Sequence, residues 1–253
     1  DSITESAGLT RVVSYTYYGT SESGGNPGDL KSVTYPEITE TPTGNNFSPG
    51  RSLTYTYDTS TSPALTGNLL TIKDGRNYTV LTNTYHSSDR VVMQVWGSDG
   101  VTDAVVSFDY PASPAGLEFG ETKKTIVNDG EGNVSEYFFN NDNQLERVRE
   151  YTGRAVANLV TTEDTNRPTG KVRSADPDHY ETRFDWNADD FLLERINTRN
   201  NRIKNTYETD PTRIANVTTI ERFEGLGATP KLTETFSHYQ AVGETDFDFA
   251  QTL

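Results

Sequence analysis

The histidines are the first residues to test for chemistry, because imidazole acts as a general base and as a metal ligand near neutral pH. His86, His179 and His238 lie far apart in the sequence, and none has the spacing of a metal-binding motif. The chain has no cysteine, no Gly-X-Ser-X-Gly motif and no glycine-rich phosphate loop. We therefore predict no catalytic residue, no cofactor and no metal centre.

Oxygen ligands are dense in one stretch, Asn128-Asp129-Gly130-Glu131-Gly132-Asn133. Asp129 and Glu131 are the weak candidates for a Ca²⁺ site, because hard cations take several carboxylate and carbonyl oxygens. The spacing is not that of a known Ca²⁺ loop, and the same residue types are typical of a hairpin turn. A turn is the favoured interpretation.

Aromatic side chains could stack on sugar rings, and Tyr57, Trp96 and Trp186 are the candidates for carbohydrate binding. The alternative is cross-strand packing, where an aromatic pair contributes about 0.2–1 kcal/mol. Tyr55 and Tyr57 alternate along the sequence, which places both on one face of a strand. We favour packing, because it is the ordinary use of strand aromatics.

Arginines are the groups that could hold a polyanion, as in a polysaccharide lyase. Their simpler role is to pair with a facing Glu across strands. The strand-borne candidates are Arg147, Arg149, Arg173, Arg183 and Arg195. Carboxylate pairs for acid–base catalysis cannot be singled out, and Asp at a repeat position has a structural use in accepting backbone N–H bonds.

Composition and charge limit the possible partners. The chain has 253 residues and a formal net charge of -15. This charge repels nucleic acid and anionic membranes, and no run of about 18 apolar residues is present, so we predict no nucleic-acid partner and no membrane span. Only 32% of residues are hydrophobic, yet there are 14 Tyr and 11 Phe, which favours a broad sheet with a thin core. Because residue 1 is Asp, we expect a fragment or a processed product, with any export signal outside it.

The region Arg51–Gly97 shows the elements that position these residues. A Thr/Tyr strand ends in Tyr57-Asp58, Gly67-Asn68-Leu69 opens a second strand, and the pattern returns in Val80–His86 and Val91–Gly97. Thr and Tyr suit strands, whereas Asp, Asn and Gly suit turns. Each unit therefore predicts a β-hairpin. His86 stands where the pattern has Asp, which indicates a structural role.

The same pattern predicts an all-β chain of consecutive antiparallel hairpins. We assign residues 1–10 to a lead-in, 11–239 to the hairpin array and 240–253 to a tail. Second strands recur about every 20 to 25 residues, which is typical of a repeat architecture. A weaker unit spans Leu159–Ala175, and the last predicted strand is Lys231–Tyr239, for which no partner strand is identified. The other predicted strands are Arg11–Tyr18, Leu30–Tyr35, Val105–Tyr110, Glu121–Val127, Val134–Asn140, Gln144–Tyr151, Gly170–Arg173, Glu181–Asn187, Phe191–Asn197, Arg202–Glu208 and Arg213–Glu221.

These residues resemble the YD repeat of the Rhs family. Tyr55-Thr56-Tyr57-Asp58, Gly67-Asn68-Leu69 and Lys73-Asp74-Gly75 match its motif, and the resemblance covers most of residues 11–239. It implies one long curved or spiralling sheet that forms part of a hollow shell, as in Rhs effectors, Tc toxin B/C components and teneurins. The family's C-terminal self-cleaving aspartates are not found, so the resemblance carries over no catalytic residue.

Three functions compete. The first is a non-catalytic structural segment of a shell from a large secreted or surface bacterial protein, with a toxin-encapsulating or cell-contact role. Its partners would be other repeats or segments of the parent chain, an encapsulated toxin, or glycans. The second is a carbohydrate-binding module, and the third is a polysaccharide-active enzyme on an all-β scaffold. We favour the first.

Overall fold

The computed structural model consists of β-strands and turns. It describes residues 2–4, 12–36, 50–60, 65–97, 104–155, 167–168, 170–209, 214–238 and 250–252. No helix occurs in these ranges, and nothing within them forms a helix able to cross a membrane. The chain divides into two compact units, the first with the strands up to β8 and the second with those from β9 on, except that the turn Asn128–Glu131 groups with the first.

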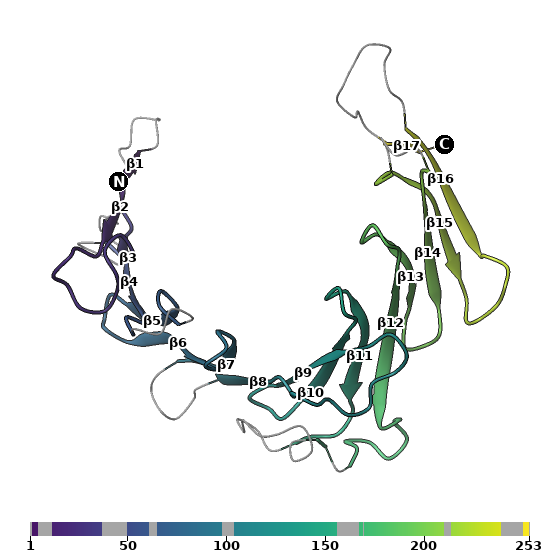
Figure 1. Cartoon of the computed structure of the whole chain (residues 1–253), viewed down its shortest axis with the longest axis horizontal. Helices are drawn as coiled ribbons and strands as arrows, with labels where there is room; N and C mark the ends of the chain where they lie inside the picture. The colour runs from purple at the N-terminus through teal and green to yellow at the C-terminus, as the bar shows by residue number, and fades with distance from the viewer. Residues whose placement is uncertain are drawn as a thin grey trace, which may run out of the picture. The chain divides into compact units, whose positions relative to one another are not determined.

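The first unit is a ladder of antiparallel strands in chain order (Figure 1). Each strand pairs with the next along the chain. The strands are β1 (Ser2–Thr4), β2 (Val12–Tyr17), β3 (Leu30–Thr34), β4 (Ser52–Tyr57), β5 (Leu69–Asp74), β6 (Thr79–Tyr85), β7 (Val91–Trp96) and β8 (Ala104–Asp109).

The second unit repeats this arrangement. Its strands are β9 (Lys123–Asn128), β10 (Val134–Phe139), β11 (Leu145–Tyr151), β12 (His179–Trp186), β13 (Leu192–Ile196), β14 (Arg202–Tyr207), β15 (Val217–Phe223), β16 (Leu232–His238) and β17 (Ala250–Thr252). The prediction of an all-β chain of consecutive antiparallel hairpins is confirmed.

Three details differ from the sequence prediction. Residues 170–173 form a bend and not a strand, so Arg173 is not strand-borne. In this segment the Val172 N–H donates to the Thr152 carbonyl, and the Val172 side chain is 62% exposed. The lead-in contributes β1, and the tail contributes β17, which pairs with β16. Residues 159–166 of the predicted weak unit lie outside the described residues.

Five hairpin turns share one backbone hydrogen-bond pattern, in which the first side chain also accepts at least one turn N–H. The Asn197 turn illustrates the fullest form. The Asn197 side-chain Oδ1 accepts the N–H groups of Arg199 and Asn201, both at 3.0 Å. The Asn200 N–H donates to the Asn197 carbonyl, and the Asn197 N–H donates to the Asn201 carbonyl. The residue three positions into each turn has a φ between 61° and 66°, a left-handed conformation that Asn and Asp tolerate. The turns begin at Asp74, His86, Asn140, Asn187 and Asn197.

An aromatic residue ends the first strand of most hairpins, and the pairing register shifts at that residue. Tyr57, for example, faces Leu69 after a shift between Thr56 and Tyr57. Such a bulge inserts one extra residue, and here that residue is Leu70 of the second strand, because Thr56 and Tyr57 face Thr71 and Leu69. The equivalent pairs are Tyr17–Leu30, Tyr85–Val91, Phe139–Leu145, Trp186–Leu192 and Tyr207–Val217. The repeat motif thus marks the aromatic residue, the turn, and the apolar residue that faces the aromatic residue beside the bulge.

A second recurring bond reaches from a leucine carbonyl to the following strand, and it occurs at Leu69, Leu145 and Leu192. The Leu69 carbonyl accepts the Tyr85 hydroxyl and the Asn83 amide, both at 2.9 Å. The Leu192 carbonyl accepts the Tyr207 hydroxyl at 3.0 Å and the Asn205 amide at 2.9 Å. At the Leu145 carbonyl the donor is the Trp186 indole N–H, at 2.8 Å. Every copy places its donor on the strand after the leucine, so these bonds fix the register between successive hairpins.

The described core is small and unusually polar. Its buried hydrophobic residues are Tyr18, Val33, Val105, Ile126, Val134, Phe138 and Phe223. Among the most deeply buried side chains are two charged ones, Arg147 and Glu136, which are 1% and 0% exposed. Lys and Arg almost never bury fully without a partner, so these residues mark the candidate site.

Candidate functional site

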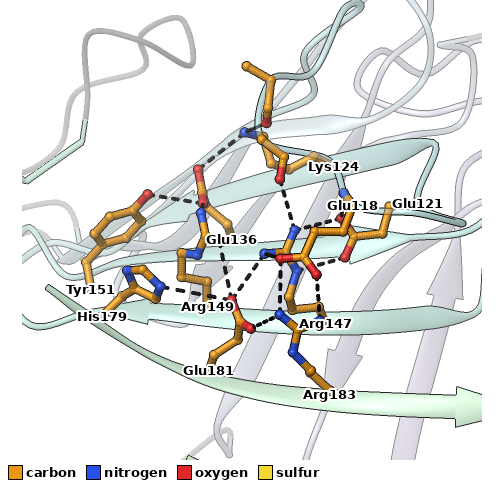
Figure 2. Close-up of polar contacts among 12 residues, drawn as sticks. Glu118, Glu121, Lys124, Glu136, Arg147, Arg149, Tyr151, His179, Glu181 and Arg183 are labelled. Atoms are coloured by element: carbon orange, nitrogen blue, oxygen red, sulfur yellow. Dashed lines mark hydrogen bonds and ion pairs between the residues drawn. The ribbon is translucent and has the colours of Figure 1, made fainter. Parts of the chain in front are cut away.

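The candidate site is an ionic network on one face of strands β9–β12 in the second unit (Figure 2). Side chains two residues apart share a strand face, and the register aligns Glu136 with Arg149 and Arg149 with Glu181. Residues 110–122, which precede β9, lie against this face and are called the strap below. The network comprises Glu118 and Glu121 of the strap, Lys124, Glu136, Arg147, Arg149, Tyr151, His179, Glu181 and Arg183.

Arg147 is the centre of the network and uses all five of its N–H groups. Its Nε and Nη2 atoms donate to the two oxygens of Glu121, both at 2.7 Å. The Nη1 atom donates to Glu118 at 3.0 Å and to Glu181 at 3.1 Å, and Nη2 donates again to the Gly116 carbonyl at 3.0 Å. A paired Arg–carboxylate fork is among the strongest hydrogen-bonded arrangements in proteins. Arg147 therefore ties the strap to strands β11 and β12.

The ring of Phe138 forms the floor under these cations. Its side chain is 0% exposed, and the guanidinium carbon of Arg147 lies 3.9 Å from the ring centroid. Arg149 and Lys124 approach the same ring at 5.4 Å and 5.5 Å. Cations attract the negative face of an aromatic ring, by about 0.5–2 kcal/mol each depending on desolvation. Phe138 lies on the opposite face of β10 from Tyr137 and Phe139, because side chains alternate along a strand.

Glu136 is the fully buried acid of the network. Its Oε1 lies 3.3 Å from Lys124 Nζ and 2.9 Å from Arg167 Nη2. Its Oε2 lies 3.3 Å from Arg149 Nη1 and accepts the Tyr151 hydroxyl at 3.1 Å. Because removal of one partner leaves a buried charge at a cost of about 3–5 kcal/mol, Glu136 and its partners act as one unit.

The carboxylates at the edge of the network are held ionised. The pKa of Glu118 is lowered, chiefly because Arg183 donates hydrogen bonds to it; burial opposes this, and the charge of Arg147 adds to it. Burial raises the pKa of Glu181, but the Arg147 hydrogen bond and the nearby charges of Arg183 and Arg149 outweigh burial, so the pKa is lowered.

Tyr151 and His179 are the groups that acid–base catalysis would use, and their rings lie 5.9 Å apart. Burial, and then the charge of Glu136, raises the pKa of Tyr151, so its hydroxyl stays protonated near neutral pH and is not available as a base. Burial and the positive charge of Arg149 lower the pKa of His179, which favours neutral imidazole. The cations of this face are engaged by carboxylates, as Arg147 shows, so the arrangement favours a structural role over lyase chemistry.

The three predicted sugar-stacking residues occupy different surroundings. The Tyr57 ring lies edge-on to Tyr18, with the centroids 6.4 Å apart. Trp186 is half-buried and donates its indole N–H to the Leu145 carbonyl. Trp96 is 41% exposed and aligns across the sheet with Leu81, Ile72 and then Tyr55. Tyr57 and Trp96 lie in the first unit, and Trp186 lies in the second.

The remaining candidates are the acids proposed for Ca²⁺ and two histidines, and those with described side chains take part in turns. The Glu131 N–H donates to the Asp129 carboxylate at 2.9 Å, as in a capped turn. The described residues contain no cluster of three or more acidic or His side chains that could hold a metal ion. The His86 Nδ1 accepts the Ser88 N–H at 3.1 Å, which confirms its predicted structural role. The side chain of His238 lies outside the described residues.

The prediction that strand arginines pair with a facing Glu across strands is confirmed for Arg149, which faces and contacts both Glu136 and Glu181. Arg147 and Arg183 face each other across β11 and β12, and they pair instead with Glu121 and Glu118 of the strap. Arg195 instead faces Phe184 and Ile203.

The sequence pattern did not single out the strap acids Glu118 and Glu121, nor Lys124 and Glu136. For the last two, one local signal was present. Lys124 shares a strand face with Ile126, and Glu136 shares a strand face with Phe138. Each charged residue therefore lies on the same face as an apolar residue, which indicates that it is buried.

Comparisons with known proteins complete the description. No protein-family model matches the chain, and no curated protein gives a significant match. The crystal structure of TcdB2-TccC3-Cdc42 matches 92% of this chain at 12% identity, with a TM-score of 0.37. That of TcdB2-TccC3 matches 99% at 12% identity, with a TM-score of 0.36. TcdB2-TccC3 without the hypervariable C-terminal region matches 99% at 11% identity, with a TM-score of 0.35.

The chain spans 14%, 15% and 14% of the three matched chains. Because the TM-scores are low, we base the function on this chain's own contacts.

Proposed function

We propose that the chain is a non-catalytic structural segment of a YD-repeat shell from a large secreted or surface bacterial protein. The single observation that carries this proposal is the recurring unit itself. A register shift at the aromatic residue, a side-chain-capped turn and a bond to the preceding leucine carbonyl appear together in two separate hairpins, at Tyr85 and at Trp186. Such units contact mainly their neighbours and can extend without limit.

The ionic network supports the same role. It links four strands and the strap through charged side chains. In a larger domain, a second layer packed on the sheet would hold the strands together instead. A single sheet with a thin core needs such ties, because alternate residues of each strand face solvent. The toxin-encapsulating or cell-contact role is the part of the proposal that the sequence resemblance implies.

An exposed sheet edge provides the test. Among the described residues, β17 covers only Phe236–His238 of β16, so Leu232–Thr235 have no described strand on that side. Unpaired strand edges recruit further strands, as the next hairpin of a shell would. We expect the chain to self-associate as its concentration rises, which analytical ultracentrifugation measures. The double variant Thr233→Lys/Thr235→Lys should remain monomeric at the same concentrations, because edge lysines block strand addition.

The matched control is Thr54→Lys/Thr84→Lys, which places the same charges on exposed positions of β4 and β6, strands paired on both sides. It should associate like the unmodified chain. The proposal is contradicted if the unmodified chain stays monomeric at all concentrations. It is also contradicted if the edge variant associates as well as the unmodified chain.

Carbohydrate binding is the second candidate, and the exposure of Trp96 is the observation that favours it. An exposed indole can stack on a sugar ring, and here it stands at one end of an apolar row. Glycan-array binding that disappears in Trp96→Ala with an unchanged melting curve would support it. Absence of binding to every glycan would dismiss it.

A further inference from the structure

The strap is attached to the sheet mainly by charged and polar contacts. Of residues 110–122, only Glu121 is buried, and Phe119 is fully exposed. Its described attachments include the carboxylate pairs with Arg147 and Arg183, the bonds from Arg147 and Lys124 to the carbonyls of residues 116 and 115, and a backbone bond from the Thr122 N–H to the Phe139 carbonyl at 2.8 Å. Elements with few buried apolar contacts open at low free-energy cost. The strap is therefore less firmly held than the strands beneath it.

Glu118 and Glu121 are presented by a tight turn. The Glu121 N–H donates to the Glu118 carbonyl at 3.1 Å, and the Glu118 N–H donates to the Glu121 carboxylate at 2.7 Å. Gly120 has a φ of +94°, which a turn of this kind requires and glycine supplies without strain. The turn directs both carboxylates to Arg147 (Figure 2). Phe119, between them, is fully exposed. An acidic turn is thus the shape that this face accommodates.

The face beneath the strap is cationic once the strap acids are set aside. Strands β9–β12 place four cations on it, Lys124, Arg147, Arg149 and Arg183, against two carboxylates, Glu136 and Glu181, a net charge of +2. Arg167 adds a further cation beside Glu136. This concentration of positive charge stands on a chain with a formal net charge of -15. Arginine forks match carboxylates in geometry as well as charge.

We infer that the strap is a removable occupant of this cationic face, and that the face binds an acidic β-turn segment of another polypeptide when the strap lifts. Two observations specify a peptide and not a free anion. Arg147 and Lys124 donate to backbone carbonyls of the strap as well as to carboxylates, and the two carboxylates reach Arg147 from residues three apart. This inference does not depend on the shell proposal.

The first test uses the unmodified protein. Hydrogen–deuterium exchange should show the amides of Glu121 and its strap neighbours exchanging at least 100-fold faster than those of β10 and β11. Raising the salt concentration should speed strap exchange further, because salt screens exposed ion pairs such as Arg183–Glu118. A strap that exchanges as slowly as the strands overturns the inference.

The second test measures binding in trans. The probe is a synthetic peptide with the strap sequence Gly116–Thr122, blocked at both ends, and affinity is measured by fluorescence anisotropy. The double variant Glu118→Gln/Glu121→Gln should bind it at least tenfold more tightly than the unmodified chain, because its own strap no longer competes. A peptide with Gln in place of both Glu residues should bind neither protein.

Control variants separate this outcome from a change in folding. Arg183→Gln, added to the double variant, removes one partly exposed cation and should weaken peptide binding at least fivefold. Glu224→Gln, an exposed acid paired with Lys231, should behave like the unmodified chain. If the double variant keeps its strand signature by circular dichroism and binds no peptide, the inference is wrong. If it unfolds, the strap is a structural part of the sheet and the inference is equally wrong.

Discussion

The capping side chain of the Asn197 turn gives the sharpest prediction. Asn197→Ala removes one oxygen that accepts two backbone N–H groups at 3.0 Å. A hydrogen bond contributes about 0.5–1.5 kcal/mol net, and the Arg199 N–H can bond to water instead, so we expect a loss of about 1–2 kcal/mol. At roughly 2–4 °C per kcal/mol for a domain of this size, the melting temperature should fall by about 2–8 °C.

Thermal unfolding followed by circular dichroism measures this loss. Asn197→Asp keeps the acceptor oxygen and should stay within about 0.5 kcal/mol of the unmodified chain. Thr198→Ala, in the same turn, keeps both backbone donors and serves as the matched control. If Asn197→Ala and Thr198→Ala melt together, the side-chain cap does not hold the hairpin, and the explanation of the repeat motif is wrong.

Three further predictions concern other positions. His86→Asn should raise stability by about 0.5–1 kcal/mol, because an amide oxygen can cap both turn N–H groups as Asn197 does. His179→Gln should flatten the loss of stability between about pH 7.5 and pH 5.5: the lowered pKa of His179 means that the unfolded chain takes up the proton first, so stability falls below pH 6.5. Trp186→Ala should cost about 2 kcal/mol or more, because it removes a half-buried ring and its bond to Leu145, whereas Trp96→Ala should cost less.

Each of these has a contrary result. A His86→Asn variant that melts earlier shows that the imidazole makes a contact that the turn needs. If a His179→Gln variant loses stability with falling pH as steeply as the unmodified chain, groups other than His179 cause that loss. The control is Trp96→Ala, in the other unit, which should keep the full dependence of stability on pH. The lowered pKa values of Glu118 and Glu181 act in a separate window, since their stabilisation is lost only as the pH falls below about 4.5. Equal losses in the two tryptophan variants contradict their different roles.

Much of the fold could be predicted from local patterns. The alternation of Tyr and Thr ending at Tyr57-Asp58 predicts a strand and its turn, and both depend on neighbouring residues alone. The strand predicted at Gly170–Arg173 is wrong, because that prediction also used neighbouring residues alone. Tertiary contacts override the local pattern there: the Val172 N–H donates to the Thr152 carbonyl, and Lys171 pairs with Asp178.

The ionic network could not be predicted, because its burial depends on residues distant in sequence. Glu136 stands in a polar stretch that is typical of a solvated strand face. Its burial depends on its register with Arg149 and on its contacts with Lys124, Tyr151 and Arg167. Arg147 and Glu118 are separated by 29 positions and meet through the strap. A charged residue on the same strand face as Phe138 was the one available local signal.

Removal of one whole hairpin tests the central claim most directly. Deleting Asn187–Tyr207, which holds β13 and β14, joins Trp186 to Glu208 and preserves the alternation of strand direction. Deleting Asn197–Tyr207 removes a single strand and reverses every later one. If the chain is an array of equivalent hairpins, the first deletion should fold cooperatively with an unchanged strand signature by circular dichroism, and the second should not. Two deletions that behave alike would contradict the repeat account.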